Sequence, residues 1–343
     1  MRRKVLITNW VHTDVHRMLD EVGSVEANME RVPWSRAETV RRAQDASAMV
    51  AFMTDSVDED FLARCPQLKV IACALKGADN FDLEACKRRG VSVCIVPDLL
   101  TAPTAELTVG LMIMLGRNLL LGDRSIRTEG FSGWRPNFYG TGLDGSAVGI
   151  IGMGAVGQAI ARRVRGFRSR ISYFDERRLR PSEEDALDVV YRDLRTIIGG
   201  SDYLVLAAPL TGTTYHIIGA EEISTMKRGA LLINPARGSL VDESAVADAI
   251  ESGHLGGYAA DVHECEDWAI AGRPDKINER LIRHPRTVLT PHLGSGVDRI
   301  RHEIAVAAAS DIVRFFAGQP MQGSVLDMRS FDSRAQPTGT VHA

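Results

Sequence analysis

Three polar residues in the last third of the chain have the side chains needed to bind an anion and exchange a proton with it. Arg237 lies in Asn-Pro-Ala-Arg-Gly, Glu266 in Asp-Val-His-Glu-Cys-Glu, and His292 in Thr-Pro-His-Leu-Gly-Ser, and each follows a short apolar run that predicts a buried strand. A guanidinium group can hold an oxyanion with two parallel hydrogen bonds. An imidazole can exchange a proton near neutral pH, and a neighbouring carboxylate favours its charged form. The trio therefore predicts an enzyme site with an anion anchor and an acid/base pair.

A glycine-rich segment upstream of the trio predicts a dinucleotide site. The sequence Gly152-Met153-Gly154-Ala155-Val156-Gly157 follows the apolar run 148–151 and leads directly into a helical pattern. Such a loop makes a tight turn and places a pyrophosphate on the amides of a helix N-terminus. Asp175 ends the next predicted strand, close to the spacing of about 20 residues expected for an acid that binds the ribose hydroxyls. We therefore expect NAD as the cofactor, whereas a contact of Arg177 or Arg178 with a 2′-phosphate stays open.

The bulk properties exclude several other classes of protein. A chain of 343 residues is long enough for two domains, and its net charge of -3 gives no electrostatic footprint for nucleic acid. No apolar run reaches about 18 residues, so we expect no membrane-spanning helix. The five cysteines show no Cys-x-x-Cys pairing, which indicates free thiols in a reducing cytoplasm and no zinc site. We expect no metal.

Apolar runs alternate with helical stretches in two series, which predicts an α/β protein with two doubly wound, Rossmann-like parallel sheets. In the first series we expect strands at residues 5–8, 49–53, 70–73 and 91–96, and helices at 14–21, 37–46 and 83–89. In the second we expect strands at 147–151, 170–174, 203–207, 230–233, 257–261 and 287–290, and helices at 157–165, 221–225 and 243–251. A long helix at 105–121 and a glycine- and aromatic-rich loop at 130–145 separate the two series.

The second series is expected to be inserted into the first. A last helix at 299–316 returns to the first unit. We therefore expect residues 1–99 and 294–328 to form a substrate-binding domain and residues 100–293 to form the NAD-binding domain. Residues 329–343 are polar and are expected to form a loosely ordered tail.

Four motifs, taken in order, resemble the D-2-hydroxyacid dehydrogenase family: Gly-x-Gly-x-x-Gly, Asn-Pro-Ala-Arg-Gly-Ser-Leu-Val-Asp-Glu, Asp-Val-x-x-x-Glu and Thr-Pro-His-x-Gly-Ser. The similarity covers most of the chain. It implies that Arg237 anchors the substrate anion, that His292 is the acid/base residue and that Glu266, rather than Glu264, pairs with it. The cofactor contacts that it implies are Thr104, Gly152, Gly154, Ala155, Val156, Gly157, Asp175, Ala207, Ala208, Pro209, Pro235, Ala236, Arg237, Asp261, His292 and Gly294.

Two departures from the family pattern point to a narrower resemblance. Asp267 stands where the family usually has proline, and Lys76 stands where a small or apolar residue usually precedes Gly77. An added lysine indicates a substrate with more negative charge than one carboxylate. With Trp134, Tyr139, Trp268 and Arg301, these residues resemble the phosphite (phosphonate) dehydrogenases of the family.

This narrower resemblance implies NAD-dependent oxidation of phosphite to phosphate. Arg237 and Lys76 would hold the small dianion, and His292 would deprotonate the attacking water, although it could instead orient phosphite as a cation while another group is the base. The residues implied to shape the substrate pocket are Met53, Gly77, Leu100, Trp134, Tyr139, Ser295 and Arg301. The family resemblance further implies a homodimer built through the region 105–145.

Two other functions stay open. The chain could act on a 2-hydroxy or 2-keto acid, as a D-2-hydroxyacid dehydrogenase or a glyoxylate/hydroxypyruvate reductase does. It could also be an NADH-sensing binding protein of the kind found among transcriptional corepressors.

Overall fold

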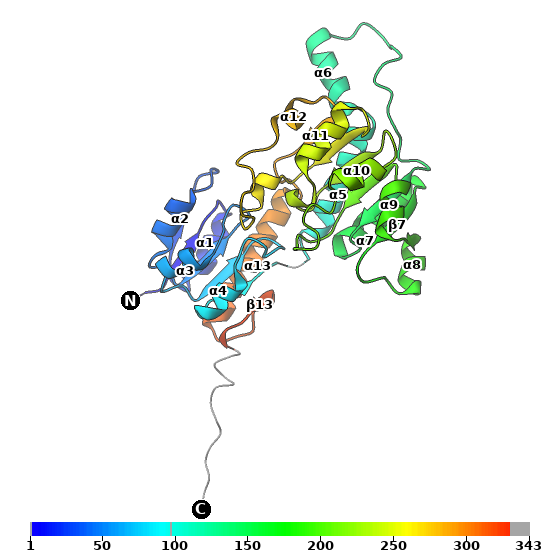
Figure 1. Cartoon of the computed structure of the whole chain (residues 1–343). Helices are drawn as coiled ribbons and strands as arrows, with labels where there is room; N and C mark the ends of the chain where they lie inside the picture. Colours follow the sequence, from blue (N-terminus) through cyan, green and yellow to red (C-terminus); the bar gives the residue numbers. More distant parts are fainter. Residues whose placement is uncertain (1, 97, 330–343) are drawn as a thin grey trace, which may run out of the picture. The chain divides into compact units, whose positions relative to one another are not determined.

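The computed structural model describes residues 2–96 and 98–329, which form two compact units (Figure 1). Of the described residues, those up to Leu100 and those from Asp298 belong to the first unit, and Thr101–Val297 form the second. We expected the chain to return to the first unit at residue 294. It returns at Asp298, because the Asp261 carboxylate accepts hydrogen bonds from the amides of Leu293 and Gly294 and so holds their loop in the second unit.

The C-terminal tail was expected to begin at residue 329. Arg329 is ordered, since its guanidinium forms an ion pair with Asp327 at 2.7 Å and donates to the carbonyl oxygen of Phe315 at 3.0 Å. The remaining part of the predicted tail, residues 330–343, lies outside the described residues.

The first unit contains a six-stranded sheet with the order β13-β5-β4-β3-β1-β2. Its strands are β1 (Lys4–Ile7), β2 (Ser24–Ala27), β3 (Ala48–Ala51), β4 (Val70–Cys73), β5 (Ser92–Cys94) and β13 (Ser324–Leu326), and only β13 is antiparallel to its neighbour among these described strands. Its helices are α1 (Thr13–Asp20), α2 (Arg36–Ala43), α3 (Glu59–Arg64), α4 (Leu83–Arg88) and α13 (Asp298–Phe316). The order 2-1-3-4-5 of the parallel strands is that of flavodoxin-like folds.

The second unit contains a parallel seven-stranded sheet with the order β12-β11-β10-β9-β6-β7-β8. Its strands are β6 (Ala147–Ile151), β7 (Arg170–Phe174), β8 (Val189–Tyr191), β9 (Tyr203–Leu206), β10 (Leu231–Asn234), β11 (Gly257–Ala260) and β12 (Thr287–Leu289). Its α-helices are α5 (Thr101–Gly116), α6 (Leu119–Glu129), α7 (Ala155–Val164), α8 (Pro181–Leu187), α9 (Leu194–Gly200), α10 (Ala220–Thr225), α11 (Glu243–Glu251) and α12 (Glu279–Arg283). Three short 3-10 helices are η1 (Arg165–Phe167), η2 (Gly238–Leu240) and η3 (Glu264–Glu266). The expectation of two Rossmann-like parallel sheets is confirmed.

The strands of the second unit are apolar on both faces because helices cover both. On β9, the side chain of Val205 packs in the cluster that contains Leu111 and Ile160, whereas Leu204 and Leu206 pack in the opposite cluster. Alternate residues of a strand point to opposite faces, so a continuous apolar run is needed where both faces are buried.

The prediction of one long helix at 105–121 is wrong, because two helices occupy this region. Helix α5 ends at Gly116 and α6 begins at Leu119, with a bend of 59° between them. A side chain at Gly116 would lie 2.1 Å from the hydroxyl oxygen of Tyr203, so the chain passes close to the core there. Asn118 then adopts a left-handed conformation with φ of 54°, and its amide nitrogen donates to the carbonyl oxygens of Phe138 and Tyr139. These contacts break the helix although its apolar pattern continues.

Several short elements were missed, among them β2, β8, β13, α3, α8, α9 and α12. They are short segments, and β2 and β13 lie at the edges of their sheet with half-exposed residues, so their hydrophobic patterns are weak.

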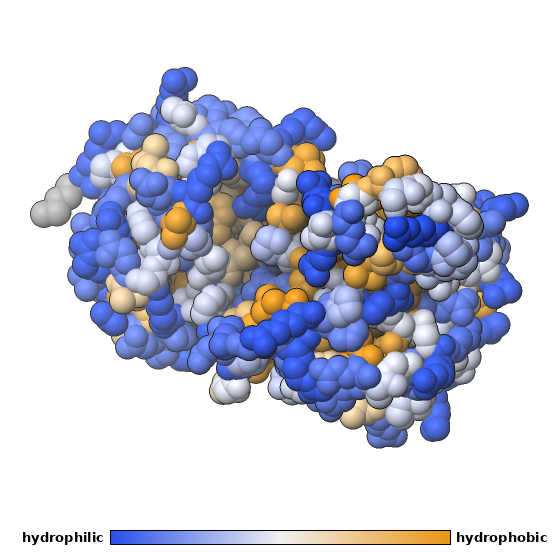
Figure 2. Space-filling model, turned by 90° about the horizontal axis from the view of Figure 1, so that it is seen from above, coloured by the Kyte–Doolittle hydropathy of each residue, from blue (hydrophilic) through white to orange (hydrophobic). Residues whose placement is uncertain are grey.

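The face of the molecule in Figure 2 is mostly hydrophilic, with hydrophobic residues in separate small areas. Among the described residues, no single helix is long and apolar enough to cross a membrane, and only the bent pair α5 and α6 passes by length and composition. The α5 side chains of Leu111, Met112 and Leu115 are buried in the core of the second unit.

Candidate active site

The loop between β6 and α7 has the geometry of a phosphate-binding turn. Gly152 has φ of 96°, and a side chain there would collide with the backbone of Ala207 and Ala208 at 2.5 Å. A side chain at Gly157 would lie 2.1 Å from the carbonyl oxygen of Gly152, so α7 packs closely on the loop. The space around Gly154, which precedes the first residue of α7, is open. The first amides of α7 can therefore be approached by an anion, and the loop fits the pyrophosphate of NAD.

This loop lies where the strand order reverses. Strand β6 pairs with β7 on one side and with β9 on the other, and the crevice at such a reversal is the usual ligand site of an open α/β sheet. Ala207, Ala208 and Pro209 follow the end of β9, and the backbone of Ala207 and Ala208 borders the glycine loop. Their expected contact with the cofactor stays a prediction.

Asp175 follows β7 and is hydrogen-bonded to the glycine loop. Its Oδ2 accepts from the amide of Met153 at 2.6 Å, and its Oδ1 accepts from the amide of Arg177 at 2.9 Å. Arg178 is engaged elsewhere, because its guanidinium donates to both carboxylate oxygens of Glu184 at 2.8 and 2.9 Å. This ion pair gives Arg178 a structural role, so its presence in the sequence does not have to be explained by a contact with a 2′-phosphate.

Arg237, Glu266 and His292 come from the loops that follow β10, β11 and β12. These three strands are neighbours and parallel, with Asn234 opposite Ala260 and Ala260 opposite Leu289. The three loops therefore leave the same edge of the sheet, although the residues are far apart in the sequence.

The turn that carries Arg237 is held by the buried side chain of Asn234. The Asn234 oxygen accepts from the amide of Ala236 at 3.1 Å, and its nitrogen donates to the carbonyl oxygen of Arg237 at 2.8 Å. Pro235 and Ala236 are the first residues of this turn, and the half-buried Arg237 side chain lies after them.

Glu266 and His292 form the predicted pair. Nδ1 of His292 lies 2.7 Å from Oε2 of Glu266, and the second carboxylate oxygen accepts from the amide of His263 at 3.1 Å. Glu264, the other candidate, binds Nε2 of His216 at 2.7 Å instead. Since Nδ1 is used by Glu266, the opposite ring nitrogen of His292 is the one that can serve a substrate.

His292 itself has φ of 57°, which is uncommon outside glycine. The loop around it is organised by Asp261, whose oxygens accept from the hydroxyl of Thr290 and from the amides of Leu293 and Gly294 at 2.6 to 2.7 Å. Burial raises the pKa of Asp261, although these hydrogen bonds act in the opposite direction. Thr104 packs at the same loop, since a side chain at Gly294 would lie 3.1 Å from its hydroxyl oxygen.

The loops of Arg237 and Glu266 are in direct contact. A side chain at Gly238 would lie 1.9 Å from the carbonyl carbon of His263, so only glycine allows the two backbones to approach this closely. The buried Asp267 carboxylate accepts from the amide of Ser239 at 2.7 Å. Asp267 thus has a structural partner.

A buried polar network beneath these loops was missed by sequence reasoning. Glu243 is 1% exposed, and its carboxylate accepts from the amides of Glu264 at 3.2 Å and Asn278 at 3.3 Å. His263 is 4% exposed, and its Nε2 lies 3.2 Å from the carbonyl oxygen of Thr290. Glu243 ends the motif that contains Arg237, and His263 lies inside the motif that ends at Glu266, but nothing in the sequence pattern shows that either side chain is buried.

Four residues of the predicted substrate pocket, together with Lys76, belong to the first unit. Lys76 and Gly77 are half-buried in the loop after β4. Leu100 packs against the core of the unit, and Met53 follows β3. Arg301 lies in the first turn of α13, where its guanidinium donates to the carbonyl oxygen of Ala74 at 3.4 Å.

The three other predicted pocket residues belong to the second unit. Trp134 and Tyr139 are 79% and 72% exposed in the segment that follows α6 (Figure 1). Ser295 is buried, with 4% exposure, in the loop after His292.

Comparisons with known proteins agree on one family. Residues 109–294, more than half of the chain, match the family described as "D-isomer specific 2-hydroxyacid dehydrogenase, NAD binding domain". The chain is 34% identical to the glyoxylate reductases of Thermococcus litoralis and Pyrococcus horikoshii over 93% of its own length and 95% and 94% of theirs. A solved structure of a protein from Thermus thermophilus is similar, with a TM-score of 0.83, 32% identity and coverage of 94% of this chain and 100% of that one. A glyoxylate reductase from Paecilomyes thermophila has a TM-score of 0.81 and 25% identity, covering 94% and 98%.

These relatives overturn the prediction of phosphite oxidation. The relatives are named glyoxylate reductase, which supports the alternative function on a keto acid. Two residues of the phosphite-type pattern also have structural partners. Asp267 binds the backbone of Ser239, and the 41% exposed Trp268 ring lies 4.1 Å from the guanidinium of Arg273.

The inference of a phosphite substrate from Lys76 was also wrong. One loop lysine adds a positive charge to the first unit, but it does not show whether the hydride comes from phosphorus or from carbon. The fold, the glycine loop, the Glu266–His292 pair and the sequence matches together lead to one conclusion: the chain belongs to the D-isomer specific 2-hydroxyacid dehydrogenase family and is an oxidoreductase with an NAD-binding domain.

Proposed function

We propose that this protein reduces a small 2-keto acid, such as glyoxylate or hydroxypyruvate, to the corresponding 2-hydroxy acid. The observation that carries the proposal is the hydrogen bond of 2.7 Å between His292 and Glu266, in the same unit as the dinucleotide loop. The names of the relatives support this substrate class.

The bound nicotinamide supplies the hydride for the keto carbon. Nε2 of His292 donates a proton to the keto oxygen, and Glu266 holds the ring in position by Nδ1. Arg237 binds the substrate anion with its guanidinium fork and keeps the keto group oriented. The balance is one keto acid, one NADH and one proton converted into one hydroxy acid and one NAD.

The roles of the other predicted residues stay predictions. These are the substrate contacts of Lys76, Gly77, Leu100 and Ser295, and the cofactor contacts of the loops after β6, β9 and β10. They rest on the family resemblance.

The test is the loss of NADH absorbance when the protein is mixed with NADH and glyoxylate or hydroxypyruvate. We expect turnover by the wild-type chain and a loss of about a hundredfold or more in kcat for His292→Ala, because a positioned acid/base group contributes about 10² to 10⁴ to the rate. NADH binding without turnover of any small keto acid would contradict the proposal.

We further propose that two copies of the chain associate through α6 and the segment that follows it. No residue of α6 is buried in the single chain. The segment projects from the rest of the second unit in Figure 1, and its exposed apolar side chains are Leu119, Leu120, Ile126, Phe131, Trp134, Phe138 and Tyr139. Such a concentration of exposed aromatic residues is typical of an interface. A second copy would also account for the exposure of Trp134 and Tyr139 in the single chain.

A cytoplasmic location is proposed as well. All five cysteines are free and four of them are buried, which suits a reducing compartment.

A further inference from the structure

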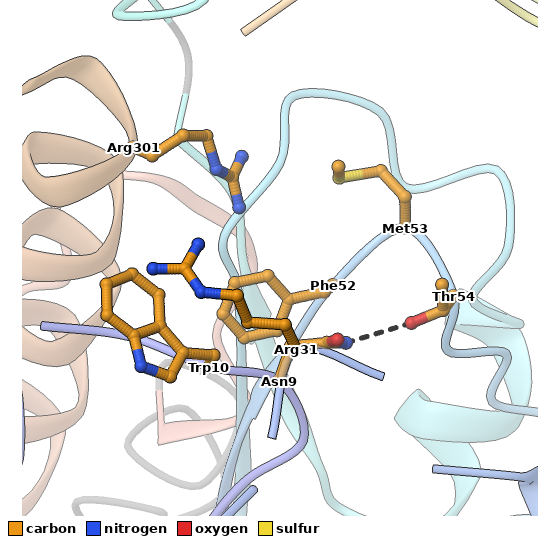
Figure 3. A pocket seen from close by; sticks show the side chains of 7 residues that line it. All are labelled: Asn9, Trp10, Arg31, Phe52, Met53, Thr54 and Arg301. Atoms are coloured by element: carbon orange, nitrogen blue, oxygen red, sulfur yellow. Dashed lines mark hydrogen bonds between the residues drawn. The ribbon is translucent and has the colours of Figure 1, made fainter. Parts of the chain in front are cut away.

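A pocket of about 240 Å³ opens within the first unit (Figure 3). It is lined by Asn9, Trp10, Arg31, Phe52, Met53, Thr54 and Arg301. Met53 and Arg301 were expected to contact substrate, whereas the other five residues have no role in the reaction as proposed. The pocket is smaller than the usual range of about 300 to 1,000 Å³ for drug-sized ligands, so its occupant must be small.

The position of the pocket in the sheet is that of a ligand site. Asn9 and Trp10 follow the carboxyl end of β1, and Phe52, Met53 and Thr54 follow the carboxyl end of β3. These strands are neighbours at the point where the strand order reverses, with β2 on the far side of β1 and β4 on the far side of β3. Open α/β sheets bind ligands outside the carboxyl ends of their strands at such a reversal.

Two guanidinium groups meet in this pocket from segments that are far apart in the sequence. Arg31 lies over the ring of Trp10 at 4.3 Å, and Arg301 lies over the ring of Phe52 at 5.6 Å. Figure 3 shows that both side chains line the pocket. Each guanidinium fork can donate hydrogen bonds to an oxyanion, so the lining offers two cationic groups to one anionic ligand.

The remaining lining residues favour an organic anion over an inorganic one. Phe52 and Met53 add apolar surface to the lining of the pocket. Asn9 donates from its amide to the Thr54 hydroxyl oxygen at 2.9 Å, so the Thr54 hydroxyl keeps its own hydrogen as a donor. A carboxylate with a short apolar body matches this combination of two cations, one donor and an apolar wall.

We propose that the pocket binds a small organic carboxylate, with the carboxylate between Arg31 and Arg301 and its carbon chain against Phe52 and Met53. This site goes beyond the proposed keto-acid reduction, because five of its seven lining residues were not predicted to contact the keto acid. It shares Met53 and Arg301 with the predicted substrate pocket.

Trp10 provides a direct readout of binding. We would titrate the full-length protein with propionate and, in a second arm, with inorganic phosphate, and follow tryptophan fluorescence. We expect a saturable change with propionate that is absent in Trp10→Phe, which assigns the signal to this pocket. Arg31→Gln and Arg301→Gln should each weaken propionate binding by about tenfold or more, because hydrogen bonds to charged groups contribute about 1.5 to 3 kcal/mol.

Two control variants distinguish binding in this pocket from a general loss of positive charge and from binding at the keto-acid site. Arg17→Gln removes the same charge from an exposed position on α1 and should leave the titration unchanged. Arg237→Gln should abolish keto-acid turnover but also leave the Trp10 signal unchanged, so that failure of the proposed reaction and failure of this site are distinguishable. Equal affinity in Arg31→Gln and Arg17→Gln, no saturable signal, or saturation by phosphate but not by propionate would overturn the proposal.

Discussion

The carboxylate of Asp267 accepts a hydrogen bond of 2.7 Å from the backbone amide of Ser239. This bond joins the loop that carries Glu266 to the loop that carries Arg237, at the place where Gly238 already packs against the backbone of His263. The anion anchor and the acid/base pair are therefore not independent, since any shift of one loop is transmitted to the other. A residue that looked like a marker of a special substrate is in fact a link between two parts of the candidate site.

We expect Asp267→Ala to lower kcat for glyoxylate reduction more than tenfold. The substitution leaves the amide of Ser239 buried and unpaired, at a cost of about 1 to 3 kcal/mol, and frees the two loops to move. Asp267→Asn keeps an oxygen acceptor and should recover most of the rate. Steady-state kinetics and thermal unfolding of both variants would test this, with the exposed Asp275→Ala as the matched control. Wild-type kcat in Asp267→Ala would contradict the link.

A second prediction concerns the bond between Glu266 and His292. The Glu266 carboxylate fixes the orientation of the imidazole ring through Nδ1, and a proton donor that can rotate away from the keto oxygen is less effective. Glu266→Ala should therefore lower kcat for glyoxylate reduction by about tenfold or more, whereas Glu266→Gln keeps an oxygen that can accept from Nδ1 and should recover part of the rate. The measurement is steady-state kinetics of both variants beside wild type. Wild-type kcat in Glu266→Ala would mean that Glu266 does not act through His292.

A third prediction concerns the choice between NADH and NADPH. Asp175→Ala should raise the ratio of kcat/KM for NADPH to that for NADH by about tenfold or more, because the carboxylate repels a 2′-phosphate and binds the ribose hydroxyls. The Asp175→Asn variant separates the effect of the charge from that of the hydrogen bond, since it removes the charge but keeps an acceptor for the amide of Met153. Arg178→Gln is the control and should leave the ratio unchanged, because Arg178 is paired with Glu184. A constant ratio in the Asp175 variants would remove the ribose role.

A fourth prediction concerns stability and the buried Asp55. Burial raises the pKa of Asp55 from 3.8 to about 6, although the hydroxyl of Thr8 and the amide of Phe52 donate to its carboxylate. The folded state thus holds this proton more tightly than the unfolded state. The contribution is favourable at low pH and is lost as the pH rises from about 4 through about 6, by up to about 3 kcal/mol.

The side chain in the Asp55→Asn variant cannot ionise, so the variant should not lose this stability as the pH rises. The free energy of unfolding of the variant, measured by urea denaturation, should therefore exceed that of the wild type above pH 6 by more than it does at pH 4. A difference between the two proteins that does not change with pH would show that Asp55 has an ordinary pKa.

A fifth prediction concerns assembly. Replacing Phe131 and Trp134 together by serine should shift the protein from dimer to monomer, because exposed aromatic side chains would otherwise be buried between two copies. Val32→Ser, which changes a 72% exposed residue of the first unit, is the control and should not affect assembly. Light scattering after size-exclusion chromatography distinguishes the outcomes. A wild-type chain that elutes as a monomer would exclude the proposed association.

Much of the fold could be predicted from local patterns. The apolar runs at β6, β9, β10 and β11 are short and continuous because helices cover both faces of the sheet, and the spacing of Gly152, Gly154 and Gly157 is dictated by one turn. The break between α5 and α6 could not be predicted in this way. It depends on the hydroxyl of Tyr203 and on the bonds of Asn118 to Phe138 and Tyr139, which are distant in the sequence or follow a loop.

The substrate was predicted least well, and the reason is physical. Lys76, Asp267 and Trp268 were interpreted by residue type, but the part that a charged or aromatic side chain plays depends on its partner. Asp267 binds the amide of Ser239, and the Trp268 ring stacks with Arg273.

The amino-acid sequence alone determined the α/β class, the dinucleotide loop and the three polar residues that follow adjacent strands, because each depends on spacing within a short segment. The family resemblance already implied that Glu266, rather than Glu264, pairs with His292, and the structure shows this bond. Only the tertiary structure decided that Asp267 joins the loops of Glu266 and Arg237. It also decided that Arg31 and Arg301, 270 positions apart in the numbering, line one pocket. Such pairings are set by strand order and loop packing, which bring together residues whose separation along the chain carries no information about their distance in space.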